Sequence, residues 1–188
     1  MKAGATNLLI IVDRNGTLIE DRPFLGKNSN WNQEIRLKET VVSYLAYLQA
    51  KYNTTTIVVS NQAGVALGYF DCETVEMINR QIHILLRSRG VNVDHWQYCP
   101  YIDQAYAQSK GGPTVNLSFV REKTKRKPSP EMVYDALKEL DYSPSLQQFS
   151  EIAMIGNCQD DRALAQGIKS KFVDVNNCSL KELLQQFS

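Results

Sequence analysis

The stretch LLIIVDRNGTLIED, Leu8 to Asp21, decides the fold of this 188-residue chain. An apolar run ends in a single carboxylate, Asp13, which is followed at once by an Asn-Gly pair typical of a tight turn. A run that is apolar on both faces predicts a central strand of a parallel sheet, because helices cover both faces of such a sheet. Packing does not explain the charge at the tip of this strand or the amide of Asn15 two residues later. Both polar groups therefore indicate a role other than packing at this point.

Strand and helix patterns alternate along the rest of the chain. Their lengths predict an α/β fold, a three-layer α/β/α sandwich with a central parallel sheet, and we interpret residues 1–188 as a single domain. The expected strands are 7–13, 54–62, 93–100, 151–157 and 171–176, and the expected helices are 38–52, 71–90, 129–142, 160–167 and 179–187.

The composition excludes several classes of protein. A formal net charge of +1 argues against a generally nucleic-acid-binding surface, although a local basic patch stays open. No apolar run is long enough to span a bilayer, and the N-terminal apolar stretch is too short for a signal peptide. The four cysteines are scattered and form no Cys-x-x-Cys pair. We therefore expect reduced thiols and a cytoplasmic protein without a membrane partner, whose oligomeric state the sequence leaves unknown.

Two long connections interrupt the alternation, at 14–36 and at 100–126. Loops of this length in a compact domain are usually functional, because ordering them costs entropy. Both are expected to leave the sheet at the carboxyl ends of its strands, which is where ligands bind in open parallel sheets. The sequence therefore predicts a binding site at this edge.

Polar side chains capable of phosphate chemistry follow the predicted strands. The carboxylate of Asp13 can attack phosphorus or hold a hard cation, while the hydroxyl of Ser60 and the ammonium of Lys127 can bind phosphate oxygens. Oxygen ligands from Asp13, Asn157 and Asp161 suit Mg²⁺, which keeps several water ligands. Each residue alone is explained equally well by an ordinary turn or cap. Their common position at strand ends predicts a shared phosphate and magnesium site.

The segments DRNGTLI, VVSNQAGVALGYF, KRKPSPEM and MIGNCQDD resemble the four motifs of the haloacid dehalogenase-like (HAD) phosphohydrolases. Within this superfamily the chain is most similar to the group of heptose bisphosphate phosphatases and histidinol-phosphate phosphatases. It is more distantly similar to polynucleotide 3′-phosphatases. The resemblance covers nearly the whole chain and implies a Rossmann-like sheet, with spacings too short for a large cap domain.

The resemblance also implies a role for each matching position. Asp13 would be the nucleophile that forms an aspartyl-phosphate, and it would also bind Mg²⁺. Ser60 and Lys127 would hold the phosphoryl group, and Asn61 and Arg126 would contact the substrate. The implied activity is Mg²⁺-dependent hydrolysis of a small phosphorylated metabolite such as a sugar phosphate.

The remaining metal ligands would come from two other motifs. The backbone carbonyl of Asn15 would bind Mg²⁺, Asn157 would complete the shell, and Asp161 would support it. Asn157 stands where these proteins usually have Asp, a mild change because the amide still offers an oxygen.

Asn15 is the more serious departure, because these phosphatases have a general acid–base Asp at this position. An amide has no titratable proton near neutral pH, and loss of such a group costs about 10²- to 10⁴-fold in rate. Three explanations stay open. The amide is natural, in a slow phosphatase or a non-catalytic relative; it is an engineered Asp→Asn change; or deamidation of the Asn-Gly pair restores Asp in part of the molecules.

The zinc ligands of some relatives are missing. Only Cys99-Pro100 remains of a Cys-Pro-His, and 123–125 reads Lys-Thr-Lys where those relatives have Cys-x-Cys. One thiolate cannot form a tetrahedral structural site, so we expect no zinc. Leu67 replaces an Arg common in the heptose-type enzymes, which leaves the substrate open.

Two other functions remain as alternatives. One is a catalytically weak phosphate-binding or regulatory relative, consistent with Asn15. The other is an enzyme like the polynucleotide 3′-phosphatases, in which the basic run 121–127 would follow a nucleic acid. The same run is more typical of a solvated loop.

Overall fold

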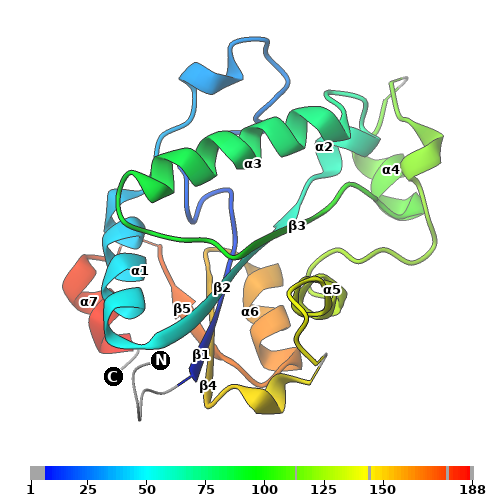
Figure 1. Ribbon diagram of the computed structural model, residues 1–188. Helices are drawn as coiled ribbons and strands as arrows, with labels where there is room; N and C mark the ends of the chain where they lie inside the picture. Colours follow the sequence, from blue (N-terminus) through cyan, green and yellow to red (C-terminus); the bar gives the residue numbers. More distant parts are fainter. Residues whose placement is uncertain (1–6, 113, 144, 177, 187–188) are drawn as a thin grey trace.

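The computed structural model describes residues 7–112, 114–143, 145–176 and 178–186. In this part of the chain, five strands form one parallel sheet in the order β3-β2-β1-β4-β5 (Figure 1). The strands are β1 (Asn7–Val12), β2 (Asn53–Asn61), β3 (His95–Cys99), β4 (Glu151–Gly156) and β5 (Lys171–Asp174). The central strand β1 is buried from Leu8 to Val12, which explains why it shows no alternation of polar and apolar residues.

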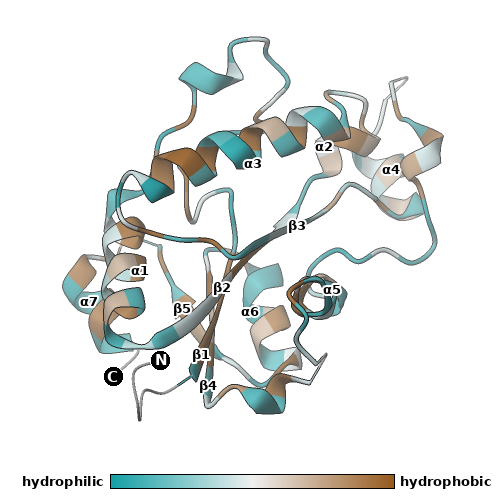
Figure 2. Ribbon diagram, in the orientation of Figure 1, coloured by the Kyte–Doolittle hydropathy of each residue, from teal (hydrophilic) through white to brown (hydrophobic). Residues whose placement is uncertain are grey.

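Helices cover both faces of the sheet (Figures 1 and 2). On one face, Leu8 and Ile10 of β1 pack in a core with α1 (Glu39–Lys51), α3 (Cys72–Arg87) and α7 (Leu180–Gln186). On the other face, Leu9 and Ile11 pack with α5 (Glu131–Glu139) and α6 (Gln159–Gly167). Successive residues of a strand point to opposite faces, so one apolar run supplies both cores. The predicted three-layer α/β/α sandwich is confirmed.

The expected strands and helices form, with ends displaced by a few residues. Helix α3 begins after Asp71, whose side chain accepts a hydrogen bond from the Thr74 backbone N–H at 2.8 Å, as predicted for its cap. The last residue expected in the final helix, Phe187, lies outside the described residues, as does the N-terminal segment 1–6. No helix in the described ranges is both long and apolar enough to cross a membrane.

The two long connections contain more structure than the sequence predicts. The first contains a 3₁₀ turn, η1 (Trp31–Gln33), and buries Leu18, Ile19 and Leu25 in the core that holds Leu8. The second contains helix α4 (Gln104–Lys110) and a 3₁₀ turn, η2 (Leu117–Phe119), in place of the expected loop. Short turns without a sustained apolar stripe give no periodic signal, and the helix α2 (Ala63–Ala66) and the turn η3 (Leu146–Gln148) escape prediction for the same reason.

The second connection is fastened to the end of α2. The Asn116 backbone N–H donates to the Ala66 carbonyl at 2.8 Å, and the Thr114 hydroxyl donates to the Leu67 carbonyl at 2.8 Å. Gly68 follows with φ +74°, and a Cβ atom there would lie 2.2 Å from the Thr114 carbonyl oxygen. The lack of a side chain at Gly68 therefore permits this contact between chain segments.

The substitution Gly68→Ala tests this close approach. Gly90, which follows α3 at φ +76°, is a matched control because nothing lies within 4 Å of its Cβ position. Gly90→Ala should cost about 1–2 kcal/mol through the left-handed backbone alone. Gly68→Ala should cost at least about 1 kcal/mol more through the added clash. Urea unfolding of both variants measures the difference, and equal losses would contradict the assigned contact.

Candidate active site

The site lies where the order of strands reverses. The chain proceeds from β1 outward to β2 and β3, and then returns to β4 on the other side of β1. Ligands bind at such switch points in open parallel sheets. Asp13 follows β1 here, and its backbone N–H donates to the Ile155 carbonyl of β4 at 2.9 Å. Asn157 follows β4, so these two predicted site residues leave adjacent strands at the same edge.

A buried ammonium holds two carboxylates at this edge. The Nζ atom of Lys127 pairs with an Asp13 oxygen and lies 2.7 Å from the Asp161 Oδ1 atom. All three residues are buried, with exposures of 4% for Lys127, 6% for Asp13 and 0% for Asp161. The structure thus brings together three residues from distant motifs that the sequence assigned to one site.

Burial and charge both act on the protonation of this group. Burial raises the pKa of the Asp13 carboxyl above its usual value, although the Lys127 ammonium acts in the opposite direction. Burial alone would lower the pKa of Lys127, but the charges of Asp13 and Asp161 outweigh it and raise that pKa. Lys127 therefore keeps its positive charge, next to the place where a phosphate would bind.

Asp161 uses both of its carboxylate oxygens within the protein. Its Oδ2 atom accepts hydrogen bonds from the backbone N–H groups of Asn157 at 3.0 Å and Cys158 at 3.3 Å, at the start of α6. Its Oδ1 atom pairs with Lys127. The geometry therefore has Asp161 orienting Lys127 and the turn that carries Asn157.

Ser60 and Asn61 end the neighbouring strand β2. The Ser60 hydroxyl is buried and accepts a hydrogen bond from the Gln62 side chain at 2.5 Å. The Asn61 amide pairs with the backbone of Lys127 in both directions, at 2.9 Å and 3.2 Å. Asn61 thereby fixes the segment that carries Lys127 against the end of β2.

Sequence reasoning missed Arg14, which is fully buried beside Asp13. Its guanidinium donates to three side-chain amide oxygens: Asn15 at 2.8 Å, Gln62 at 2.6 Å and Asn79 at 2.7 Å. Burial lowers the pKa of Arg14 to about 10, although the nearby Asp13 charge opposes this effect. Arg14 links the turns after β1 and β2 to helix α3, and through Gln62 it reaches Ser60.

A signal for this network was present in the sequence. Asn79 falls among Val75, Ile78 and Ile82 on the buried stripe of α3, where an amide needs a buried partner. The four buried charged residues of the described chain are Asp13, Arg14, Lys127 and Asp161. All of them belong to this one site.

The oxygen atoms near Asp13 determine which metal ion this site can hold. The Asn157 side-chain oxygen accepts from the Thr17 hydroxyl at 3.1 Å, which places Asn157 against the turn after β1. Within the described ranges, no group of three or more His, Cys, Asp or Glu residues is arranged to hold a metal. The available donors are the Asp13 carboxylate, the Asn157 amide oxygen and backbone carbonyls. These hard ligands fit Mg²⁺, which accepts one or two carboxylates and completes its shell with phosphate and water.

A pocket of about 260 Å³ opens beside these residues. The predicted residues Asn15, Asn61 and Arg126 line it together with aromatic rings, and Arg126 lies 5.1 Å from the centre of the Tyr106 ring. The aromatic residues are Phe24, Phe70 and Tyr106. The two long connections supply Phe24, Tyr106 and Arg126, so both border the site as expected.

Side-chain packing holds the segment around Cys99 and Tyr101 in place. Cys99 is buried, and its thiol lies 3.7 Å from the Tyr101 carbonyl oxygen. The Arg121 guanidinium lies 4.3 Å from the centre of the Tyr101 ring, which also contacts Phe119 at 5.5 Å. Aromatic and cation–π contacts thus join the two ends of the second long connection.

Comparison with known proteins adds to this geometry. The D-glycero-beta-D-manno-heptose-1,7-bisphosphate 7-phosphatase of Pasteurella multocida is 27% identical over 162 residues, which cover 86% of this chain and 77% of that protein. The protein of the same name from Haemophilus influenzae is 27% identical over 165 residues, covering 88% and 79%. The chain is therefore similar in sequence to phosphatases of this kind over most of its length.

A solved structure shares the fold of this chain. The D,D-heptose 1,7-bisphosphate phosphatase of B. bronchiseptica, complexed with magnesium and phosphate, superposes with a TM-score of 0.63 and 24% identity. The match covers 95% of this chain and 86% of that one. No protein-family model matches the sequence. Among proteins of known activity, this chain is similar in sequence to heptose bisphosphate phosphatases.

The substitution Arg14→Met tests the buried network. It leaves three amide oxygens without their donor, at about 1–3 kcal/mol for each buried unsatisfied group. We expect a loss of about 3 kcal/mol or more in the free energy of unfolding, measured in urea. The control Arg22→Met, at an exposed arginine that pairs with Glu20, should change it by less than about 0.5 kcal/mol. An equally small change for Arg14→Met would refute the role assigned to the network.

Cys158 is the N-cap residue of α6, and the pH dependence of its thiol reactivity tests the environment assigned to this turn. Although Cys158 is exposed, partial desolvation of its thiol against this turn raises its pKa to about 11, and the Asp161 carboxylate adds to the effect. Only the thiolate reacts, so alkylation by iodoacetamide should accelerate about tenfold per pH unit from pH 7 to 10. Mass spectrometry of the Cys158 peptide measures the rate, with N-acetylcysteine as an internal reference. Levelling near pH 8.5, as for an ordinary thiol, would contradict the assigned environment.

Proposed function

We propose that this chain is a Mg²⁺-dependent phosphomonoester hydrolase that acts on a phosphorylated sugar through an aspartyl-phosphate on Asp13. The observation that carries the proposal is the pairing of Asp13 with Lys127 at the switch point of the sheet. A carboxylate nucleophile and a fixed cation here are what phosphoryl transfer requires, because positioning and charge stabilisation supply most of its catalysis. The curated relatives are named as phosphatases of a sugar bisphosphate.

In the proposed reaction, an Asp13 oxygen attacks phosphorus while the bond from phosphorus to the substrate alcohol oxygen breaks. Lys127 neutralises negative charge on the transferring group, and the buried Ser60 hydroxyl lies at the end of the adjacent strand to bind a phosphoryl oxygen. Water then attacks the phosphorus of the aspartyl-phosphate, which releases phosphate and restores Asp13. The first step needs a proton for the leaving alcohol, and the second needs a base for the water.

A magnesium ion would be held by Asp13, Asn157 and the backbone carbonyl of Asn15, and it would reduce the repulsion between the carboxylate and the phosphate. The protein's own contribution is to keep this edge rigid. Asp161 holds the Asn157 turn and Lys127, and Asn61 holds the Lys127 backbone.

Asn15 limits the proposed turnover. Its side-chain oxygen accepts from Arg14, which leaves only the amide NH₂ group to face other partners. That group can donate a hydrogen bond to an oxygen but cannot give up or accept a proton near neutral pH. Substrate binding and attack by Asp13 are therefore supported, while protonation of the leaving alcohol depends on water.

We favour a small substrate over a nucleic acid because the basic run is largely used within the protein. In this run, Arg121 stacks on Tyr101, Lys125 pairs with Asp135, and Lys127 lies buried in the site. The adjoining pocket of about 260 Å³ is of a size for a sugar phosphate rather than for a polymer.

The substitution Asn15→Asp tests the proposal directly. A carboxylate at this position restores a general acid–base group, and kcat for release of phosphate from p-nitrophenyl phosphate should rise about 10²- to 10⁴-fold. Activity should disappear with excess EDTA and return with Mg²⁺. Heptose and hexose phosphates, assayed beside a 3′-phosphorylated oligonucleotide, identify the substrate class.

Two controls make the result specific. Asn30→Asp makes the same chemical change at an exposed residue in the first long connection and should leave the rate unchanged. Adding Asp13→Asn to Asn15→Asp should abolish turnover, because the nucleophile is lost. If Asn15→Asp binds phosphate but releases none from any of these substrates, the protein is a non-catalytic phosphate binder.

A further inference from the structure

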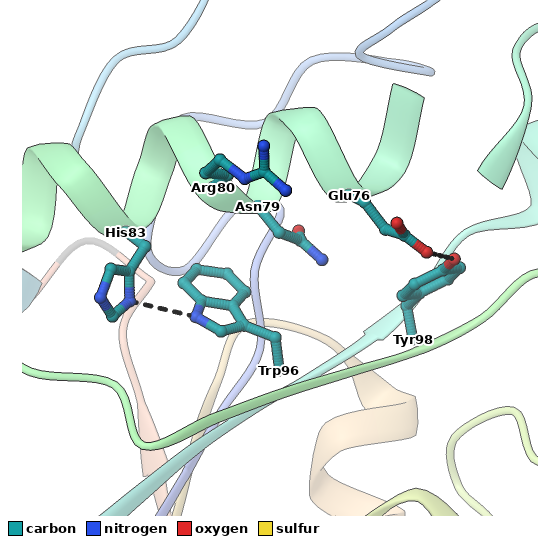
Figure 3. A pocket seen from close by; sticks show the side chains of 6 residues that line it. All are labelled: Glu76, Asn79, Arg80, His83, Trp96 and Tyr98. Carbon is teal, nitrogen blue, oxygen red and sulfur yellow. Dashed lines mark hydrogen bonds between the residues drawn. The ribbon is translucent and has the colours of Figure 1, made fainter. Parts of the chain in front are cut away.

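A second pocket, of about 380 Å³, lies between helix α3 and the edge strand β3 (Figure 3). Its volume is within the range of small-molecule sites, about 300–1,000 Å³. The lining residues share one face of the helix, with the spacing i, i+3, i+4 and i+7, and alternate positions on the strand. They are Glu76, Asn79, Arg80 and His83 of α3, with Trp96 and Tyr98 of β3.

Aromatic rings form one wall of this pocket. The Trp96 indole N–H donates to the His83 Nδ1 atom at 3.3 Å, and the two rings meet edge to face with centroids 6.3 Å apart. This bond satisfies the only polar group of the indole and holds its ring against the cavity (Figure 3). Tyr98 stands two residues further along the same face of β3. A ligand with an aromatic ring would therefore find a fixed apolar partner.

A buried amide points into the same space. Asn79 is 7% exposed, and its side-chain oxygen is occupied by Arg14 at 2.7 Å. No hydrogen bond from its amide nitrogen is present among the described residues, and Figure 3 shows this group directed between Trp96 and Tyr98. This amide nitrogen can therefore donate to a ligand that brings an acceptor into the pocket.

One charge of each sign borders the pocket. Glu76 and Arg80 are one helical turn apart, yet no salt bridge joins them within the described chain. A Glu76 oxygen accepts from the Tyr98 hydroxyl at 3.3 Å, while Arg80 has no carboxylate partner among the same residues. A ligand with a single charge would meet one group of like sign, whereas a zwitterion satisfies both.

We propose that this pocket binds a small aromatic α-amino acid. The ring lies against Trp96, the carboxylate is bound by Arg80 and the Asn79 amide, and the ammonium group is bound by Glu76. The proposal does not depend on phosphatase activity, because none of these contacts involves Asp13 or Lys127.

Binding of L-phenylalanine provides the test. The chain has two tryptophans, so Trp31→Phe leaves Trp96 as the only indole reporter. Its fluorescence should change saturably with L-phenylalanine, with a Kd of about 1 mM or tighter. If Trp31→Phe folds poorly, titration calorimetry on the unaltered protein measures the same Kd. No saturation up to about 10 mM by either method would overturn the proposal.

Two ligand analogues and two protein variants test the proposed contacts one at a time. 3-Phenylpropionate lacks the ammonium group and phenethylamine lacks the carboxylate, and each should bind at least about tenfold more weakly than L-phenylalanine. Arg80→Gln and Glu76→Gln should each weaken L-phenylalanine by a similar factor. Glu76→Gln should not weaken 3-phenylpropionate.

The matched control is Arg87→Gln, on the same helix but outside the pocket lining. It should leave the affinity for L-phenylalanine unchanged. An equal loss for Arg80→Gln and Arg87→Gln would show that only general charge matters and would refute the site. Equal affinity for 3-phenylpropionate and L-phenylalanine would refute the zwitterion and leave an anion site.

Discussion

The contact on which this site depends is the buried Lys127 ammonium between Asp13 and Asp161. It joins the end of the central strand, the turn before α5 and the start of α6, which are far apart in the sequence. Removing two carboxylates from water would be costly without a cation between them. The same ammonium therefore holds three segments of the fold together, at the edge where we propose that phosphate binds.

Arg14 connects further segments of the chain to this site. Its three hydrogen bonds to amides tie the turn after β1 to the turn after β2 and to α3. The position of Asn15 is consequently determined by the interior of the protein and not by solvent. Asn79 lines the pocket beside α3, and the Arg14 guanidinium links it to Asn15 and Gln62, which line the pocket near Asp13.

Apolar runs predicted the sheet and its covering helices well, because burial on both faces leaves an unmistakable pattern in residues such as Leu8 to Val12. Helix α4 escaped prediction because tertiary contacts stabilise its single short segment. The sequence also predicted that Asp13, Lys127 and Asp161 lie close together, because their motifs were expected at one edge of the sheet. The full burial of Arg14 and the inward orientation of Asp161 could not be predicted, since they depend on which partners the other loops bring close. Asn79 alone gave a warning, as an amide on an apolar stripe.

The formal charges of the four buried ionic residues, two carboxylates and two cations, add to zero. These four residues are therefore electrically balanced among themselves. A divalent cation entering alone would leave an excess of positive charge in a low-dielectric edge, and a phosphate dianion alone would leave the opposite excess. Under the proposed function, entry of both together would preserve neutrality, and each would increase the affinity of the other by the same factor. An acidic residue at position 15 would end this balance and shift the resting preference toward the cation.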